Sequence, residues 1–127
     1  MIIGIGTDIV HIPHFQKALD KMGEAGIQRL FTQAEQDLAK ARPAQTLPTY
    51  AKRFAAKEAV AKAFGTGIFG EINCENIEIS NGENGEPHIT LFDKAALIQQ
   101  ERSVDAIHVS LSHTEQYATA FVVLESR

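Results

Sequence analysis

One acidic side chain, Asp8, stands at the end of a β-branched and glycine-rich segment, residues 2–9, which predicts a β-strand. An isolated buried carboxylate is too costly to keep ionised, so this acid must be exposed, paired or bound to a ligand. Alternation along the strand places Asp8 on the same face as Gly4 and Gly6, which leaves that face bare beside the acid. A bare face lets another backbone or a ligand come close. From this segment alone we favour tight packing by a neighbouring helix, with Asp8 capping an adjacent group.

A second acid, Glu58, lies in an Ala-, Lys- and Glu-rich segment that predicts a long helix from near Thr49 to a C-cap at Gly65. Three of its four neighbours at helical spacing are apolar, and the fourth is Lys62. Glu58 therefore either forms a surface pair with Lys62, worth ~0.3–0.5 kcal/mol, or leans into a groove of small residues. If it meets Asp8 in that groove, a cation must separate the two carboxylates. Mg²⁺ with few protein oxygens, several waters and a substrate phosphate fits such a pair.

The same helix concentrates positive charge in a chain whose formal net charge is -4. Residues 50–62 hold four cations against the single acid Glu58, namely Lys52, Arg53, Lys57 and Lys62. Such a cluster either is simply solvated or binds a polyanion, in which case lysine acts as a point charge and arginine forms bidentate hydrogen bonds. Lys62 is the strongest candidate, because it lies one turn from Glu58 and near the glycine-rich loop of residues 65–70. That loop can offer N–H groups to a phosphate, but it lacks the ending of a P-loop, and a plain C-cap explains Gly65 equally well.

A third group of polar residues lies in the segment IHVSLSHT, residues 107–114. Alternation turns Ile107, Val109 and Leu111 toward the core and places His108, Ser110 and Ser112 on the other face. A strand with one polar face is often just solvent-exposed. A Gly-x-Ser-x-Gly elbow is missing, so a serine hydrolase is not supported, and the histidines lack metal-ligand spacing with a third ligand.

The elements that must position these groups do not alternate strictly between strand and helix. Before the long helix, we expect a helix opened by Pro13 and interrupted at Gly23 and Gly26, then a helix that starts near Gln33 with the capping box Thr32–Glu35. Pro43 and Pro48 mark a loop after it. Following the long helix, we expect a hairpin that turns at Asn84-Gly85, a short helix capped by Asp93, and a C-terminal hairpin that turns at His113–Gln116. This order indicates an α+β fold, an antiparallel sheet packed against one long helix. A length of 127 residues suits a single domain over residues 1–127.

The composition excludes several classes of protein. A net charge of -4 argues against a general nucleic-acid binder, since phosphate backbones are held by clustered lysine and arginine. The single Cys74 cannot form an internal disulfide, which favours a reducing compartment. The N-terminus lacks the features of a signal peptide, and no stretch approaches the ~20 apolar residues of a membrane helix. We therefore expect a soluble cytoplasmic protein without nucleic-acid or membrane partners.

Three segments in this order resemble the bacterial holo-acyl-carrier-protein synthases, small single-domain members of the 4′-phosphopantetheinyl transferase superfamily. They are GIGTDIV at residues 4–10, RFAAKEAVAKAFGTGI at 53–68 and HVSLSHTEQYATAFVV at 108–123. The resemblance covers nearly the whole chain. It implies Mg²⁺-dependent transfer of the 4′-phosphopantetheine group of coenzyme A to a serine of apo-acyl carrier protein, with release of 3′,5′-ADP, in fatty acid biosynthesis. It also implies a homotrimer with each coenzyme A site at a subunit boundary.

The resemblance assigns roles to individual residues. Asp8 and Glu58 match the family's Mg²⁺ ligands, completed by a coenzyme A pyrophosphate oxygen and water, and Lys62 matches a residue that contacts the phosphates. These three form the expected catalytic set, while Arg53, Gly65, His108 and Ser112 are assigned to substrate binding. The chain needs no nucleophile of its own, because the serine arrives on the carrier protein. A metal-bound water, Glu58 or a histidine could act as general base.

The first helix and the segment after it are implied to dock the acidic carrier protein. This region has three cations, Lys17, Lys21 and Arg29, against two acids, Asp20 and Glu24. We therefore expect electrostatic but modest docking. Two other functions stay open from the sequence: a non-catalytic coenzyme A- or nucleotide-binding oligomer, and a metal-dependent phosphohydrolase that needs no carrier protein.

Overall fold

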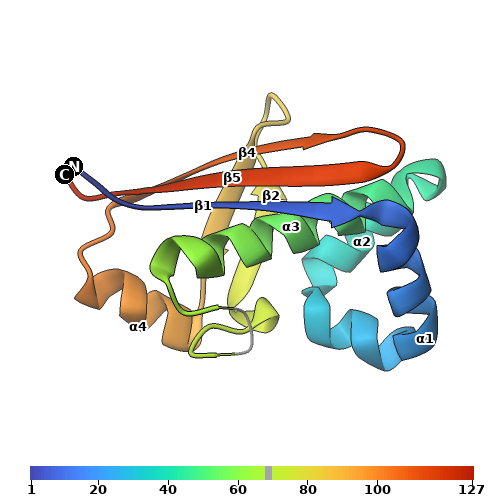
Figure 1. The fold of residues 1–127 in the computed structure, drawn as a ribbon, viewed down its shortest axis with the longest axis horizontal. Coiled ribbons are helices and arrows are strands. Elements are labelled where there is room, and N and C mark those ends of the chain that lie inside the picture. The colour runs from blue at the N-terminus through green and yellow to red at the C-terminus, as the bar shows by residue number, and fades with distance from the viewer. Residues whose placement is uncertain (68–69) are drawn as a thin grey trace.

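The computed structural model of the chain describes residues 1–67 and 70–127, so part of the glycine-rich loop lies outside the described residues. Three strands form an antiparallel sheet in the order β1 (Ile2–His11), β5 (Tyr117–Glu125) and β4 (Ala106–His113). A second antiparallel pair consists of β2 (Ile77–Asn81) and β3 (Pro87–Leu91). Both predicted hairpins are confirmed, and the two chain ends lie together beside the three-stranded sheet (Figure 1).

One long helix, α3 (Thr46–Phe64), runs along one face of the three-stranded sheet (Figure 1). The bare face of β1 is the face that packs on it. A Cβ atom on Gly6 would lie 2.1 Å from the carbonyl oxygen of Ala59, and one on Gly4 would lie 2.3 Å from that of Ala63. The favoured interpretation of the two glycines is therefore confirmed, and so is the α+β fold with an antiparallel sheet against one long helix.

The other face of the sheet is uncovered in the single chain. It carries the alternate residues of β1 and β5, and Ile5, Ile9 and Phe121 are 61%, 63% and 48% exposed. Three aligned large apolar side chains at this exposure are a surface suited to burial in an assembly.

Two helices cover the end of α3 on the side where β1 ends: α1 (Ile12–Leu30) and α2 (Gln33–Ala41). Pro13 lies at the start of α1 as predicted. Gly23 interrupts α1 with φ 67°, a left-handed conformation that glycine adopts at little cost, whereas Gly26 stays helical and buried. The capping box of Thr32 and Glu35 is confirmed at the start of α2.

Two local predictions are wrong. Pro43 opens a short 3₁₀ turn, η1 (Pro43–Gln45), and Pro48 lies in the first turn of α3, so the helix begins three residues earlier than Thr49. Proline is accepted there because its missing N–H has no helical partner to lose. Phe92 occupies the N-cap position of α4 (Asp93–Glu101) without a side-chain cap hydrogen bond, and Asp93 is the first helical residue, with φ 52°. A further 3₁₀ turn, η2 (Cys74–Asn76), leads into β2. Within the described residues no helix is long and apolar enough to cross a membrane.

Candidate active site

Asp8 and Lys62 form an ion pair where β1 meets α3. The Nζ atom of Lys62 lies 2.9 Å from Oδ1 of Asp8 and donates a second hydrogen bond, 3.0 Å long, to the carbonyl oxygen of Thr7. The Asp8 side chain is 15% exposed and that of Lys62 is 51% exposed, so solvent reaches the pair. Asp8 is thus both paired and accessible to a ligand.

Glu58 lies one turn before Lys62 on α3 and within electrostatic reach of Asp8. Burial first, and repulsion by Asp8 second, raise the pKa of Glu58 above its ordinary value of 4.5, while Lys62 partly offsets the rise. Lys62 reaches across to Asp8, 54 positions away, rather than forming the surface pair with Glu58. The structure therefore brings together the three residues of the expected catalytic set.

Two neighbouring carboxylates are a fitting start for a Mg²⁺ site. Within residues 1–67 and 70–127, no group of three histidine, cysteine or acidic side chains could hold a metal ion by itself. Mg²⁺ usually keeps several waters and takes one or two carboxylates together with substrate phosphate oxygens, so a pair suffices for it. Burial, and then repulsion by Asp8, raise the pKa of Glu58, so a cation at this place would favour the charged form of both carboxylates. The donor set of Asp8 and Glu58 thus fits Mg²⁺ bound together with a phosphate.

Lys57 does not belong to a basic surface on α3. Its side chain is fully buried, and its Nζ atom lies 2.7 Å from Oε1 of Glu35. Counting Lys57 among four cations available to a polyanion is therefore wrong. Because α3 is buried on most sides, one of its lysines lies in the core, where an ion pair with an acid compensates its charge.

A cleft of about 430 Å³ gathers three cations, Arg42, Lys52 and Arg53, beside the β2–β3 hairpin, and its described lining contains no acidic side chain. Arg53 is buried and donates a 3.4 Å hydrogen bond to Oδ1 of Asn81, while its Nε has no hydrogen-bond partner among the described residues. Burial, and then the charge of Arg53, lower the pKa of Lys52. An anion in this cleft would offset the repulsion between the cations.

No role is predicted from the sequence for two residues near this cleft, Arg42 and His113. Burial, and then Lys52, lower the pKa of His113, which lines a neighbouring cleft of about 400 Å³ together with Thr114. Both clefts share Gln45. His113 ends a strand and leads into the turn, so weighing polar residues at the ends of strands would have singled it out.

His108 and Ser112 lie away from the catalytic set. In the sheet register His108 pairs with Val123, which pairs with Ile5, so His108 shares the uncovered outer face with Ile5. Its Nε2 lies 3.0 Å from Oε1 of Glu125. Asp8 pairs with Ala120 on the inner face. Within one chain, His108 and Ser112 therefore do not meet Asp8.

Gly65 is the C-cap of α3, with φ 76° and its N–H donated to the carbonyl oxygen of Lys62. That N–H group is used by the helix end, so the structural role of Gly65 is established. The next part of the loop, residues 68–69, lies outside the described residues.

Arg53 and Lys62 point to opposite sides of α3. Nine positions separate them, or about two and a half turns at about 3.6 residues per turn. Lys62 faces β1, whereas Arg53 contacts Asn81 in the β2–β3 hairpin. The three-residue set and the cationic cleft are therefore separate surfaces of one chain.

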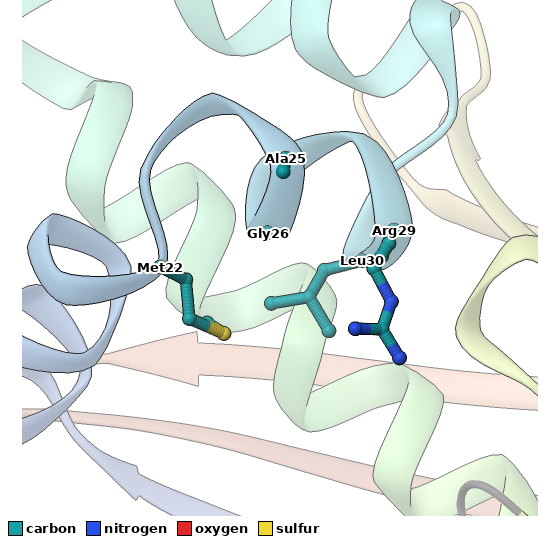
Figure 2. Close-up of a pocket in the computed structure, with 5 residues that line it drawn as sticks. All are labelled: Met22, Ala25, Gly26, Arg29 and Leu30. Atoms are coloured by element: carbon teal, nitrogen blue, oxygen red, sulfur yellow. The ribbon is translucent and has the colours of Figure 1, made fainter.

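A groove of about 220 Å³ is lined by Met22, Ala25, Gly26, Arg29 and Leu30 of α1. Figure 2 shows the side chains of Met22 and Leu30 entering it from the two sides of the break in α1, with Arg29 beside Leu30. The break at Gly23 separates two helical segments, and residues from both segments line the groove. The groove is lined by apolar side chains and by one cation, Arg29, a combination that is typical of a protein-docking surface.

An α+β fold with two carboxylates and a lysine at its sheet–helix contact is consistent with a phosphate-transferring enzyme, and a family model described as the 4′-phosphopantetheinyl transferase superfamily matches residues 4–122. The chain is similar to the holo-[acyl-carrier-protein] synthase of Aliivibrio salmonicida, with 42% identity over 125 residues that cover 98% of each protein. The chain belongs to the holo-acyl-carrier-protein synthase family of these transferases, and it is an enzyme.

Solved structures agree with this assignment. The holo-[acyl-carrier-protein] synthase of Neisseria meningitidis matches with a TM-score of 0.92 at 36% identity, covering 99% of this chain and 100% of that one. The enzyme of Bacillus anthracis, solved in complex with coenzyme A (3′,5′-ADP), matches with a TM-score of 0.82 at 37% identity, covering 100% and 99%.

Proposed function

We propose that this chain transfers the 4′-phosphopantetheine group of coenzyme A to a serine of apo-acyl carrier protein, with release of 3′,5′-ADP and dependence on Mg²⁺. The observation that carries the proposal is the convergence of Asp8, Glu58 and Lys62 at the contact between β1 and α3. It is supported by a structural relative solved with coenzyme A (3′,5′-ADP).

In this reaction Asp8 and Glu58 would hold Mg²⁺, and Lys62 would leave Asp8 to bind a pyrophosphate oxygen. When bound, Mg²⁺ supplies a positive charge that stabilises the negative charge developing on the phosphoryl oxygens and the leaving group. The serine oxygen forms a bond to the phosphorus next to the pantetheine arm, and the bond from that phosphorus to the ADP oxygen breaks. The hydroxyl proton passes to a general base, for which a histidine or an oxygen of Glu58 that Mg²⁺ leaves free can serve.

The cationic cleft of Arg42, Lys52 and Arg53 is proposed to bind the remaining phosphate of coenzyme A. Because Arg53 and Lys62 lie on opposite sides of α3, one coenzyme A molecule that uses both must take them from two copies of the chain. We therefore place the substrate between subunits of a homotrimer, with Ile5, Ile9 and Phe121 buried in the assembly. This arrangement also offers His108 and Ser112 of the outer face to a neighbouring subunit's site.

The α1 groove is proposed to dock the carrier protein (Figure 2). An acidic helix of the carrier can place an apolar side chain between Met22 and Leu30 and an acid beside Arg29. The exposed charges along α1 add little net attraction, because Asp20 and Glu24 are interspersed with the cations. We further place the reaction in the cytoplasm, which suits the free Cys74, and in fatty acid biosynthesis.

The direct test is transfer of radiolabelled pantetheine from coenzyme A to apo-carrier protein in the presence of Mg²⁺. Asp8→Asn and Glu58→Gln should each lower transfer by at least about a hundredfold, since each removes a charge from the proposed metal site. Glu101→Gln, an exposed acid in α4, is the matched control and should leave the rate unchanged. Coenzyme A binding without transfer would favour a non-catalytic binder, and phosphopantetheine release without carrier protein would favour a phosphohydrolase.

A further inference from the structure

A fully buried ion pair joins Lys57 and Glu35 in the core, and the proposed chemistry uses neither charge. The two side chains have 0% exposure, and Nζ lies 2.7 Å from Oε1. Lys57 directly precedes Glu58 on α3, while Glu35 is the third residue of α2. The pair thus connects the helix of the catalytic set to a helix outside it.

The lysine uses all three of its donors. Besides Glu35, its Nζ atom donates to the carbonyl oxygen of Leu30 at 2.8 Å and to that of Cys74 at 2.9 Å. An ammonium group has three N–H donors and no acceptor, so Lys57 is fully satisfied. These bonds tie the C-terminal end of α1 and the start of η2 to the middle of α3.

The carboxylate is engaged at both oxygens. Oε1 of Glu35 also accepts from the backbone N–H of Thr32 at 2.8 Å, and Oε2 accepts from the N–H of Ile79 at 2.8 Å. The pair therefore fixes α1, α2, η2 and β2 to one point on α3. In Figure 1, α1 and α2 lie together beside one end of α3.

Stability alone is a weak reason for this arrangement. Apolar side chains of similar volume stabilise a core as well as, or better than, a buried ion pair does. Charged hydrogen bonds differ from apolar contacts in that they have directions and fixed lengths, so they define the relative positions of the segments they join. Leu30 both accepts from Lys57 and lines the α1 groove, whose position is thereby tied to the residue beside Glu58.

We propose that Lys57 and Glu35 are positioning residues that hold the α1 docking surface at a set distance from Glu58, and so place the carrier serine against the reacting phosphate. This inference rests on the proposed function and on the α1 groove as the docking surface. A displacement of about 1 Å in such a reaction costs on the order of a hundredfold in rate. Both residues act through other groups, and neither touches substrate.

The main experiment compares the wild-type chain with the double variant Lys57→Met/Glu35→Gln. The double variant removes both charges. The glutamine amide keeps one acceptor oxygen for a backbone N–H group, whereas the carbonyl oxygens of Leu30 and Cys74 lose their donor. We expect kcat for transfer to fall by about tenfold to a hundredfold at saturating carrier and coenzyme A. The dissociation constant of coenzyme A, measured by calorimetry, should stay within about twofold, because Asp8, Lys62 and the cationic cleft are untouched.

The controls separate positioning from stability. Ile98→Val, a core substitution in α4, which makes none of these bonds, lowers stability and should keep the wild-type kcat. Glu35→Asp keeps both charges but shortens the acidic side chain by one methylene, so it should also lower kcat. This variant tests the proposal even if the double variant does not fold.

A folded double variant or Glu35→Asp variant with wild-type kcat would overturn the positioning role. So would a loss of coenzyme A affinity as large as the loss of kcat, since the pair would then act on the nucleotide site. Wild-type activity is the check on the proposed function itself. Its absence would overturn both proposals, whereas an active wild-type with unaltered variants would overturn the positioning role alone.

Discussion

The ammonium group of Lys62 lies 2.9 Å from the carboxylate of Asp8, on the neighbouring strand, although Glu58 stands one turn away on the same helix. Lys62 therefore neutralises one acid of the proposed metal site before substrate arrives. A substrate phosphate with its Mg²⁺ would take both partners of this pair, exchanging one set of ionic contacts for another. The exposure of Lys62 leaves its side chain free to make that exchange.

Replacing Lys62 by methionine should lower kcat/KM for transfer by at least about tenfold, because a positive charge aimed at the pyrophosphate is lost. The free energy of unfolding should change by about 1 kcal/mol or less, since the pair with Asp8 is partly exposed. Kinetics and urea denaturation measure the two effects. Lys94→Met, an exposed lysine of α4, should change neither quantity. Equal losses in both variants would contradict a specific role for Lys62.

The Gly6→Ala substitution should separate the two acids and destabilise the fold. The added Cβ would lie 2.1 Å from the carbonyl oxygen of Ala59 and 2.7 Å from the backbone nitrogen of Ala63, so β1 must move away from α3. We expect a loss of about 1–3 kcal/mol in stability together with reduced transfer. In Gly82→Ala the new atom meets only the ends of the Glu86 and His88 side chains, so this variant should be nearly neutral. A stable and fully active Gly6→Ala variant would show that the close contact is unnecessary.

Mg²⁺ binding should weaken as the pH falls, and this loss should begin at a pH above the pKa of an ordinary glutamate. Burial and Asp8 raise the pKa of Glu58 above 4.5, so the proton remains on this carboxyl to a higher pH and competes with the cation there. Mg²⁺ titrations between about pH 4 and pH 8 would show affinity falling as pH falls through the raised pKa of Glu58. Because Lys62 lowers the pKa of Glu58, Lys62→Met should move this loss to still higher pH. A pH-independent affinity over this range would argue against Glu58 as a ligand.

Carrier docking should depend on salt, but only modestly. The exposed charges of α1 sum to three cations and two acids, a net of +1. We expect KM for the carrier to rise by about twofold to fivefold between low and high salt, because rim charges mainly steer association. Arg29→Gln should flatten this dependence. A KM that ignores salt in the wild-type chain would refute electrostatic docking.

Cys74 should resist thiol reagents in the folded protein. The thiol is buried, and burial, as the largest cause, raises its pKa to about 11, so hardly any reactive thiolate forms at pH 8. Labelling should require denaturant. Ser80→Cys, on the exposed end of β2, should be labelled at once in the native state. Rapid labelling of native wild-type protein would mean that the core around Cys74 opens readily.

Local rules predicted much of this fold. The capping box of Thr32 and Glu35, the C-cap at Gly65 and the Asn84-Gly85 turn depend on residues within a few positions of one another, and all three appear as expected. The wrong starting point of α3 and the wrong cap at Asp93 are also local, and they arise where proline or a positive φ permits an alternative boundary.

The amino-acid sequence by itself determined which residues could do chemistry, because Asp8, Glu58 and Lys62 were distinguished by type, spacing and resemblance. Only the tertiary structure decided which of them are partners. Lys62 bonds to an acid 54 positions away and Lys57 to one 22 positions away, and helical spacing carries no information about either. Alternation likewise defines two faces for each strand, but only the register of β1, β5 and β4 shows that His108 and Asp8 lie on opposite faces of the sheet. Contacts between distant segments depend on how whole faces pack to exclude water, and that packing is a property of the folded chain.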